Sequence, residues 1–314
     1  MVAIEKRIEQ DLASGHIQGA SVHVSQRGKT LYEAHFGNAT ERSLFRIASM
    51  TKPITAVAVL LLSDQKKLRL SDPLAKYIPG FPVDLQILHL LTHTSGLSRS
   101  YYETHITDEY RVDADLLIDF IGSVPFDHDP GTYAEYSPVA AYALLTAIIE
   151  KNANMDYPSF LEKEIFQPLD MTDTTFLPTK EQWSRLVPME NTVPGCVFER
   201  YPVTNPLGGA GLISSLADYK KFAQMLLSGD LLSAEAQKTM TTPYVGQWGC
   251  GVRVIGENNR LPKGSFGWSG AYGTHFWIDP QNEIIAIYMK NSRIDGGASA
   301  KTAAHFEEDV YASL

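Results

Sequence analysis

The feature that most constrains the fold is an apolar run, "ITAVAVLLL" at residues 54–62, inside a longer segment over residues 49–66. Because nearly every position of the run is apolar, a helix built from it presents hydrophobic side chains in almost all directions and has to be surrounded by other elements. The run is shorter than the ~20 residues that a membrane-spanning helix needs. We therefore expect a central helix of several turns over residues 49–66 and no membrane span.

Segments typical of β-strands lie near both ends of the chain. The segment at residues 19–37, "GASVHVSQRGKTLYEAHFG", predicts two strands on either side of Arg27-Gly28. Near the other end, "GCGVRVIG", "SFGWSGAYGTHFWIDP" and "NEIIAIYMKN" predict three antiparallel strands. A helix is expected at the N-terminus and another over about 298–312. Strands from both ends of the chain are therefore predicted to form one antiparallel sheet flanked by helices.

The middle of the chain has a different pattern. From about residue 71 to residue 206, short helical segments alternate with connections that carry Pro and Gly, and the strongest helical candidate is residues 137–152. The predicted fold class is thus α+β. Residues 1–70 and 207–314 are expected to form one subdomain that contains the sheet, and residues 71–206 a mostly helical inserted subdomain. The active site is expected in the cleft between them.

Charge and composition limit the class of partner. Lys plus Arg number 27 against 36 Asp plus Glu, a formal net charge of −9, which argues against nucleic acid or an anionic membrane surface. Hydrophobic residues at 44% and charged residues at 20% are typical of a soluble globular protein. The opening segment, "MVAIEKRIEQDLASG", carries charges where a secretory signal needs an apolar run, so a cytoplasmic location is expected. A small molecule or a peptide is the expected partner.

Immediately before the apolar run lies "SMTK", in which Ser49 stands three residues before Lys52. The spacing alone is weak evidence, since Ser63 and Lys66 repeat it at the polar end of the same segment. Ser49 differs in its place at a helix N-terminus, where backbone N–H groups and the helix dipole can stabilise an oxyanion. One helical turn puts Lys52 on the same face as Ser49, and Pro53 stiffens that turn. Two interpretations are open: a nucleophile with an activating lysine, or an N-cap followed by a solvated lysine.

A serine hydroxyl needs a base before it can act as a nucleophile. Lys52 can be that base if burial or another cation lowers its pKa, or it can lower the pKa of a tyrosine that acts as the base. Tyr136, in "PGTYAEYSP", stands just before the strongest helix of the middle region. Such a junction could aim its hydroxyl at a cleft between the two parts of the chain.

Six segments together resemble the serine β-lactamase and penicillin-binding-protein superfamily, in particular its branch of class C β-lactamases, D-alanyl-D-alanine carboxypeptidases and family VIII carboxylesterases. They stand in the family's order from residue 45 to about residue 280: "FRIASMTKPITA", "LHLLTHTSGL", "PGTYAEYSP", "PLDMTDTTF", "GGAGLISSLADY" and "GWSGAYGTHFWIDP". The resemblance implies a β-lactamase/transpeptidase-like fold. It makes Ser49 the acylated nucleophile, Lys52 its activating partner, and Tyr136 the general base toward the serine and later the acid toward the leaving group.

The resemblance also places the family's third motif at Trp268-Ser269-Gly270, where it would bind the substrate. The backbone N–H groups of Ser49 and Ala271 would form the oxyanion hole. Two positions depart from the family pattern. Pro138 replaces the Asn of the Tyr-x-Asn motif, and Trp268 stands where β-lactam enzymes use a cation to hold the substrate carboxylate. Both departures favour a neutral ester in an aromatic-walled pocket.

The implied function is that of a serine hydrolase, a carboxylesterase that cleaves short-chain or aromatic esters through an acyl-enzyme, without a metal or an organic cofactor. β-Lactamase or D-amino-acid-specific carboxypeptidase or aminopeptidase activity is the alternative within the enzyme class. A penicillin-binding or regulatory module with little turnover is the alternative from another class. The same acyl-enzyme could also transfer its acyl group to an alcohol other than water.

Three further side chains have competing interpretations. His89 and His93 have a spacing that can bind a metal on one helix face, but no carboxylate is placed with them, and structural hydrogen bonds are favoured. Ser269, within "GWSGA", nearly matches the G-x-S-x-G nucleophile elbow. A strand follows it where the elbow needs a helix, so a substrate-side hydroxyl is favoured. His275 could point into the site or away from it, because strand residues alternate faces.

Glycines, cysteines and tryptophans give weaker signals. The loop "NPLGGAGL" at residues 205–212 lacks the spacing of phosphate-binding loops, and its glycines are expected to allow close backbone packing near the cleft. Cys196 and Cys250 lack C-x-x-C spacing and predict neither a zinc site nor a redox pair. Core packing is expected for every tryptophan except Trp268; the others are Trp183, Trp248 and Trp277.

Overall fold

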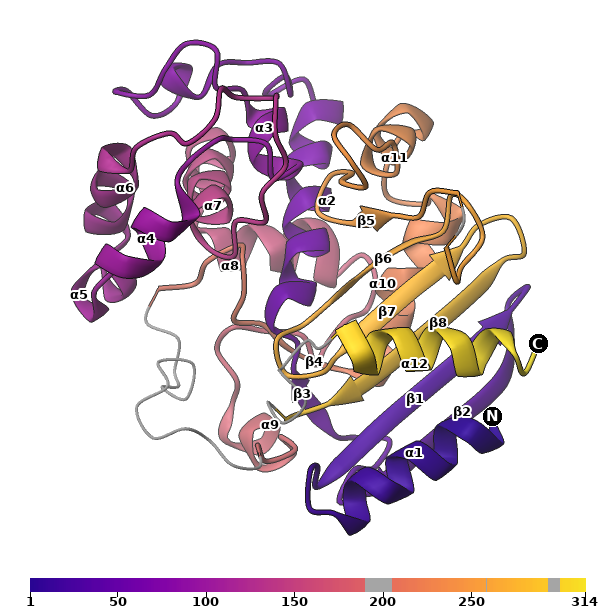
Figure 1. Ribbon diagram of the computed structural model, residues 1–314. Helices are drawn as coiled ribbons and strands as arrows, with labels where there is room; N and C mark the ends of the chain where they lie inside the picture. The colour runs from indigo at the N-terminus through magenta and orange to yellow at the C-terminus, as the bar shows by residue number, and fades with distance from the viewer. Residues whose placement is uncertain (190–204, 258, 293–299) are drawn as a thin grey trace.

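A six-stranded antiparallel sheet runs through the molecule in the order β2-β1-β8-β7-β6-β5 (Figure 1). The computed structural model describes residues 1–189, 205–257, 259–292 and 300–314. β1, near the N-terminus, pairs with β8, near the C-terminus, which confirms that strands from both ends of the chain form one sheet. The strands are β1 (Gly19–Gln26), β2 (Lys29–Gly37), β5 (Arg253–Val254), β6 (Phe266–Ser269), β7 (His275–Asp279) and β8 (Ile284–Lys290).

The C-terminal part of this sheet contains four strands where the sequence predicted three, so that prediction was wrong. The segment "SFGWSGAYGTHFWIDP" forms both β6 and β7, because a tight turn reverses the chain between them. In that turn the Gly270 N–H donates to the Thr274 carbonyl at 2.8 Å, and Gly273 has a φ of +87°, which glycine adopts without strain. In "GCGVRVIG" the strand is short: β5 has two residues, which pair with Gly267 and Phe266 of β6.

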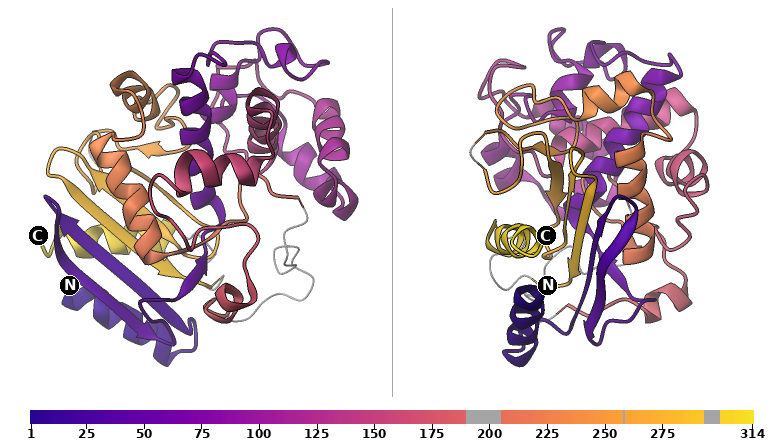
Figure 2. Two further views of the ribbon diagram at one scale, coloured as in Figure 1. Left: turned by 180° about the vertical axis from the view of Figure 1, so that it is seen from behind. Right: turned by 90° about the vertical axis from the view of Figure 1, so that its right-hand side faces the viewer.

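Helices cover both faces of the sheet. α1 (Val2–Ala13) and α12 (Ala300–Tyr311) lie on one face, and α10 (Leu216–Ser228) lies on the other (Figure 2). Because side chains alternate along a strand, neighbours on β7 enter different cores. Phe276 packs in the large core on the α10 side, whereas Trp277 packs beneath α1 and α12.

The predicted central helix is present as α2 (Thr51–Asp64), preceded by a 3-10 turn, η1 (Ala48–Met50). All its residues from Thr51 to Leu62 are buried, as the apolar run predicts. α2 packs against α7 (Ala140–Ala153) and α11 (Ala234–Met240). The start of α2 is therefore fixed deep in the molecule.

The named elements of the described chain between α2 and residue 189 are all helices. α7 corresponds to the strongest helical candidate, and it ends at Asn154, whose left-handed backbone (φ 51°) is a common helix terminator. Within the described residues, no helix has both the length and the apolar character that crossing a membrane requires. The division at residues 70 and 206 stays a prediction. The other helices here are η2 (Leu74–Lys76), α3 (Ile87–Leu91), α4 (Arg99–His105), α5 (Asp108–Val112), α6 (Ala114–Ser123), α8 (Tyr157–Leu161), the π-helix η3 (Glu162–Phe166) and α9 (Lys180–Ser184).

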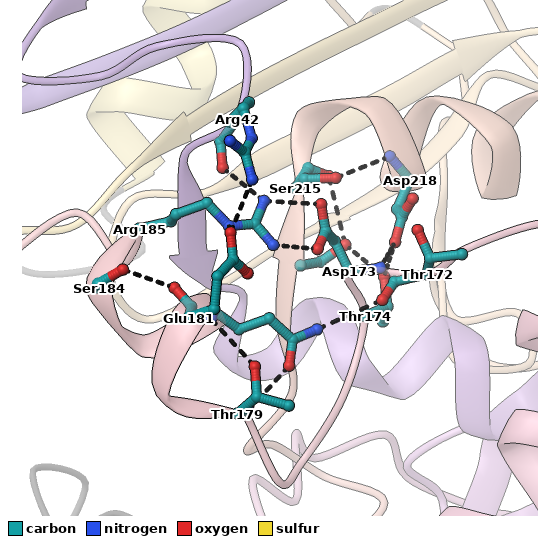
Figure 3. A network of polar contacts seen from close by, with 12 residues as sticks. Arg42, Thr172, Asp173, Thr174, Thr179, Glu181, Ser184, Arg185, Ser215 and Asp218 are labelled. Carbon is teal, nitrogen blue, oxygen red and sulfur yellow. Dashed lines mark hydrogen bonds and ion pairs between the residues drawn. The ribbon is translucent and has the colours of Figure 1, made fainter.

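A second sheet pairs β3 (Leu44–Arg46) with β4 (Ile213–Ser215), and a polar network lies beside it (Figure 3). The Arg185 guanidinium bonds both carboxylate oxygens of Asp173. The backbone N–H of Asp173 in turn donates to the Asp218 carboxylate, in the first turn of α10, at 2.7 Å. The network ties the segment around α9 to the helix that follows β4. Since β3 leads directly into η1, these contacts hold the chain on which the candidate site is built.

Candidate active site

Ser49 lies in η1, between strand β3 and helix α2. Ala48, just before it, has a φ of +44°, a conformation that is uncommon outside glycine and is often found at functional sites. The buried Tyr219 hydroxyl donates to the Met50 carbonyl at 3.0 Å and holds the turn from the α10 side. Met50, and not Ser49, is the N-cap residue of α2, and it makes no side-chain cap. The N-cap interpretation of Ser49 is therefore wrong, and its hydroxyl has other partners.

Lys52 is completely buried, with 0% of its surface exposed. Its Nζ donates to the Gly209 carbonyl at 2.7 Å and the Pro138 carbonyl at 2.8 Å, and it reaches Ser49 Oγ at 3.3 Å. Burial lowers the pKa of the Lys52 ammonium because the charged form loses its hydration, and the nearby Tyr136 hydroxyl opposes this by raising it. The lysine is therefore not solvated, and it gives up its proton more easily than a lysine in water.

Tyr136 completes a three-residue contact around the serine. Its hydroxyl donates to Ser49 Oγ at 2.7 Å, and its ring centroid lies 5.1 Å from Lys52 Nζ. The ring stacks on Trp248, with 5.7 Å between centroids and 10° between planes, and it lies 5.3 Å from the Trp268 ring. Ser49, Lys52 and Tyr136, which the sequence analysis singled out, are thus brought together by the fold.

Two glycines bring a loop carbonyl close to Lys52. A Cβ on Gly209 would lie 2.7 Å from the Pro138 carbonyl oxygen and 3.5 Å from Lys52 Nζ, so only glycine fits without displacing one of them. The Gly208 carbonyl accepts from Thr55 Oγ1 at 2.7 Å, which fixes the loop to α2. The prediction that these glycines allow close backbone packing is confirmed.

The end of β6 lies beside the turn that carries Ser49. A Cβ on Gly270 would lie 2.3 Å from the Ile47 carbonyl oxygen, and Thr274 Oγ1 donates to the same carbonyl at 3.3 Å. β5 pairs only with Gly267 and Phe266, so within the described residues Trp268 and Ser269 have no strand beyond them and form an open edge. Gly270 thus places the backbone of the third motif next to Ser49. The oxyanion hole of Ser49 and Ala271 stays a prediction.

His93 supports the segment around Tyr136, and both His93 and His89 accept a backbone hydrogen bond. His93 Nδ1 accepts from the Ser137 N–H at 3.2 Å, and its carbonyl accepts from the Glu135 N–H at 2.9 Å, so it holds the chain on both sides of Tyr136. Burial and the nearby Lys52 ammonium lower the pKa of His93 well below its usual value. His89 Nδ1 accepts from a backbone N–H at 3.2 Å. Structural hydrogen bonding of both histidines is confirmed, and the described residues contain no cluster of three metal-ligating side chains.

Trp248 is the site residue that the sequence analysis missed. Its ring contacts His93 and Trp268 as well as Tyr136, with ring centroids 4.5 Å and 4.7 Å away for the first two. Only its place between two glycines, in "GQWGCG", distinguishes it in the sequence. Of the other two tryptophans, Trp277 is core, as expected, with 1% of its surface exposed. Trp183 is 42% exposed, so the prediction of core packing was wrong for this residue.

His275 points away from the aromatic wall, toward α12. Its Nδ1 lies 2.8 Å from Ser269 Oγ, and its Nε2 lies 3.3 Å from a carboxylate oxygen of Glu307. Ser269 therefore points to the face of the sheet opposite to Trp268. Burial raises the pKa of the Cys250 thiol to about 12, which makes it a poor nucleophile. Cys196 lies outside the described residues.

Similarity to known proteins shows the family and the fold of the chain. The family model described as Beta-lactamase matches residues 4–308. The chain is 28% identical to Protein Rv1367c of Mycobacterium tuberculosis (strain ATCC 25618 / H37Rv), over 88% of this chain and 86% of that protein. It is 27% identical to Penicillin-binding protein 4* of Bacillus subtilis (strain 168), over 91% of this chain and 71% of that protein. Among solved structures, EstCE1, a hydrolase with promiscuous acyltransferase activity, has the same fold, with a TM-score of 0.85, 22% identity and 98% of both chains covered.

Proposed function

The chain belongs to the beta-lactamase family, whose members are serine hydrolases, and we propose that it is a carboxylesterase for short-chain or aromatic neutral esters that acts through an acyl-enzyme on Ser49. The observation that carries the proposal is the position of Ser49 Oγ, 2.7 Å from the Tyr136 hydroxyl and 3.3 Å from the buried Lys52 Nζ. A hydroxyl between two groups that can exchange its proton is the arrangement that an activated nucleophile needs.

In the proposed acylation step, Ser49 Oγ attacks the ester carbonyl while its proton passes to the Lys52–Tyr136 pair. Two carbonyls, of Pro138 and Gly209, occupy two donor positions of Lys52 Nζ, and the third position faces Ser49. A neutral lysine would direct its lone pair at the serine, and a charged one would direct an N–H, so we treat lysine and tyrosine as one titrating unit.

Backbone N–H groups of Ser49 and Ala271 would hold the oxyanion. Each such donor typically raises kcat by roughly 10²-fold or more. The Tyr136 hydroxyl, 2.7 Å from Ser49 Oγ, would return the proton to the leaving alcohol. Water then attacks the acyl-enzyme, and the same pair takes its proton.

Two residues support an ester over a β-lactam or a peptide. Pro138 uses its carbonyl to bind Lys52 and has no side-chain amide to bind an acyl-amide group. Trp268 presents an indole where a carboxylate-binding cation would be needed. The wall that Trp268 forms with Trp248 and Tyr136 suits an apolar acyl or aryl group.

The other candidate functions keep specific support. A relative that is named a penicillin-binding protein supports β-lactam or peptide chemistry, or stable β-lactam binding without turnover. EstCE1, whose title names acyltransferase activity, supports transfer of the acyl group to an alcohol. All of these would use the same acyl-enzyme. They differ in the substrate that acylates Ser49 and in the acceptor, if any, that removes the acyl group.

The test is the hydrolysis of p-nitrophenyl butyrate beside nitrocefin by the wild type, Ser49→Ala and the control Ser63→Ala. We expect ester turnover that is lost only in Ser49→Ala, with little nitrocefin hydrolysis. Efficient nitrocefin turnover or release of D-alanine from a D-alanyl-D-alanine peptide would overturn the substrate class. Ester turnover that survives in Ser49→Ala would overturn the nucleophile. A stable β-lactam adduct on Ser49 without ester turnover would identify a binding module.

A further inference from the structure

A turn that contains two glycines is bound by both helix α2 and helix α7, next to Lys52. Residues 207–210 form this turn, and the Ala210 N–H closes it by donating to the Leu207 carbonyl at 3.3 Å. The Gly209 carbonyl accepts from Lys52 Nζ at 2.7 Å, the shortest of the three hydrogen bonds of the ammonium group. The position of the turn therefore decides where this acceptor lies.

Two threonine hydroxyls hold both backbone groups of Gly208, the residue before that acceptor. Thr55 Oγ1, on α2, donates to the Gly208 carbonyl at 2.7 Å, and the Gly208 N–H donates to Thr146 Oγ1, on α7, at 2.8 Å. Both threonines are buried, which shields these bonds from water. Because Thr55 stands about one helical turn after Lys52, α2 contacts two successive carbonyls of the turn.

A third hydroxyl fixes the direction of the Thr55 hydroxyl. Tyr157, on α8, is completely buried, and its hydroxyl lies 2.7 Å from Thr55 Oγ1. A threonine hydroxyl has a single hydrogen, and that of Thr55 goes to the Gly208 carbonyl at 2.7 Å before the Thr51 carbonyl at 3.2 Å. Tyr157 is therefore the donor to Thr55, and burial, which raises its pKa, keeps the phenol protonated for this role.

The acceptor on the turn matters because Lys52 is buried. Burial disfavours the ammonium, and hydrogen bonds to the charged form oppose that cost. Lys52 Nζ donates to two carbonyls, of Pro138 and Gly209, so a turn that moves away leaves the ammonium with one of them and lowers the pKa of Lys52 further. The titratable side chains that face Lys52 or Thr55 from other parts of the chain include His93, Tyr136, Tyr142 and Tyr157.

We propose that Thr55, Thr146 and Tyr157 are positioning residues for the acyl-transfer step. Their hydroxyls hold the turn so that the Gly209 carbonyl keeps Lys52 Nζ in place. They act through the lysine, since their hydrogen bonds to the turn end at its backbone. The inference rests on the proposed function, because it concerns the proton transfer that forms the same acyl-enzyme.

The test is the pH profile of kcat/KM for p-nitrophenyl butyrate between about pH 5 and pH 10, followed at the isosbestic wavelength of p-nitrophenol. Thr55→Val keeps the shape of the side chain and should lower kcat/KM at the optimum about tenfold, because the lysine is held less firmly. The limb of the profile that belongs to Lys52 should move to lower pH by about one unit, because the ammonium loses an acceptor. Thr146→Val should change both quantities in the same direction.

Thr51→Val is the matched control. Thr51 lies about one turn before Thr55 on the same helix and is equally buried, and its hydroxyl has no hydrogen-bond partner among the residues that the structure describes. The same substitution at this position should leave kcat/KM within about twofold of the wild type and the limb unmoved.

Two milder variants complete the series. Thr55→Ser keeps the hydroxyl and should restore the wild-type limb. Tyr157→Phe removes only the donor to Thr55 and should give a smaller shift in the same direction, which keeps the proposal testable if Thr55→Val does not fold. Wild-type rate and limb in both Thr55→Val and Thr146→Val would overturn the proposal. An equal shift in Thr51→Val would also overturn it, because any lost hydroxyl on α2 would then have the same effect.

Two measurements separate this inference from the function on which it rests. A fluorophosphonate should label Ser49 in the wild type and in Thr55→Val alike, and a wild type with neither turnover nor labelling would count against the proposed function alone. Urea unfolding at a series of pH values follows Lys52 without turnover. The free energy of unfolding should begin to rise at a lower pH in Thr55→Val, because the folded variant releases the Lys52 proton earlier. The same onset in Thr55→Val and the wild type would contradict the positioning role.

Discussion

The two ends of helix α2 carry the same serine-x-x-lysine spacing in opposite surroundings. At the start, Lys52 is completely buried, and its Nζ contacts two backbone carbonyls and Ser49 Oγ. At the end, Lys66 is exposed and has a left-handed backbone (φ 59°), and its N–H donates to the Ser63 carbonyl at 2.9 Å. The difference teaches that the spacing only brings serine and lysine near each other, whereas burial and remote carbonyls turn such a pair into a candidate catalytic group.

Removal of the two lysines is the strongest test of this comparison. Lys52→Met is expected to lower kcat/KM for p-nitrophenyl butyrate about 10³-fold, because a positioned proton-transfer group contributes ~10²–10⁴-fold. Lys66→Met should stay within about twofold of the wild type, as expected for an exposed surface position. Circular dichroism checks that both variants fold. An equal loss of kcat/KM in the two variants would mean that Lys52, at the buried end of α2, has no catalytic role of its own.

The tyrosine can be tested against Tyr142, whose ring lies at the same distance from Lys52 Nζ. The rings of Tyr136 and Tyr142 both lie 5.1 Å from Lys52 Nζ, but only the Tyr136 hydroxyl reaches Ser49. Tyr136→Phe keeps the ring on Trp248 and should lower kcat about 10²-fold by removing the proton-transfer hydroxyl. Tyr142→Phe loses a hydrogen bond to the Leu91 carbonyl, so about 1 kcal/mol of stability and little activity should be lost.

Comparable activity of the two phenylalanine variants would contradict a catalytic role for the Tyr136 hydroxyl. Steady-state kinetics on p-nitrophenyl butyrate give the activity, and urea unfolding gives the stability of each variant.

The remote carbonyl that distinguishes Lys52 can be displaced. Gly209→Ala puts a Cβ against the Pro138 carbonyl and near Lys52 Nζ, so we expect a loss of about 1–3 kcal/mol in the free energy of unfolding. A shift of Lys52 should also lower kcat, by about tenfold. Gly256→Ala is the control, because its nearest neighbour lies 3.8 Å away, and it should change neither quantity. Wild-type kcat in Gly209→Ala would show that the loop does not position the lysine.

The smallest expected effect is a pH dependence of stability. Burial lowers the pKa of Lys52 in the folded protein below the 10.5 of an unfolded chain. Between these two values the unfolded chain binds the extra proton, so the contribution of Lys52 to the free energy of unfolding rises with pH. The wild type should therefore gain stability relative to Lys52→Met as the pH is raised toward 10.5, by at most about 1.4 kcal/mol per pH unit.

Urea unfolding at a series of pH values measures this difference, and Lys66→Met serves as the control that removes an exposed lysine. If the difference in the free energy of unfolding between the wild type and Lys52→Met does not change with pH, the pKa of Lys52 is not lowered.

Much of the local structure could be predicted because it depends on neighbouring residues. The apolar run predicted α2, and the alternating segments at the two ends predicted the antiparallel sheet. The prediction failed at Gly270 and Gly273, where two glycines make a turn inside a segment that reads as one strand. Trp248 was missed because its ring stacking depends on Tyr136 and Trp268, which neither periodicity nor spacing connects to it.

By itself, the sequence determined the central helix, the sheet from both ends and the one-turn distance between Ser49 and Lys52. These follow from backbone periodicity, which acts over a few residues. Only the tertiary structure decided which lysine is buried, because Lys52 takes its carbonyl partners from residues 86 and 157 positions away in the chain. It also decided that His275 faces Glu307 and not Ser49, since the face on which a strand residue lies depends on which elements pack against each side of the sheet.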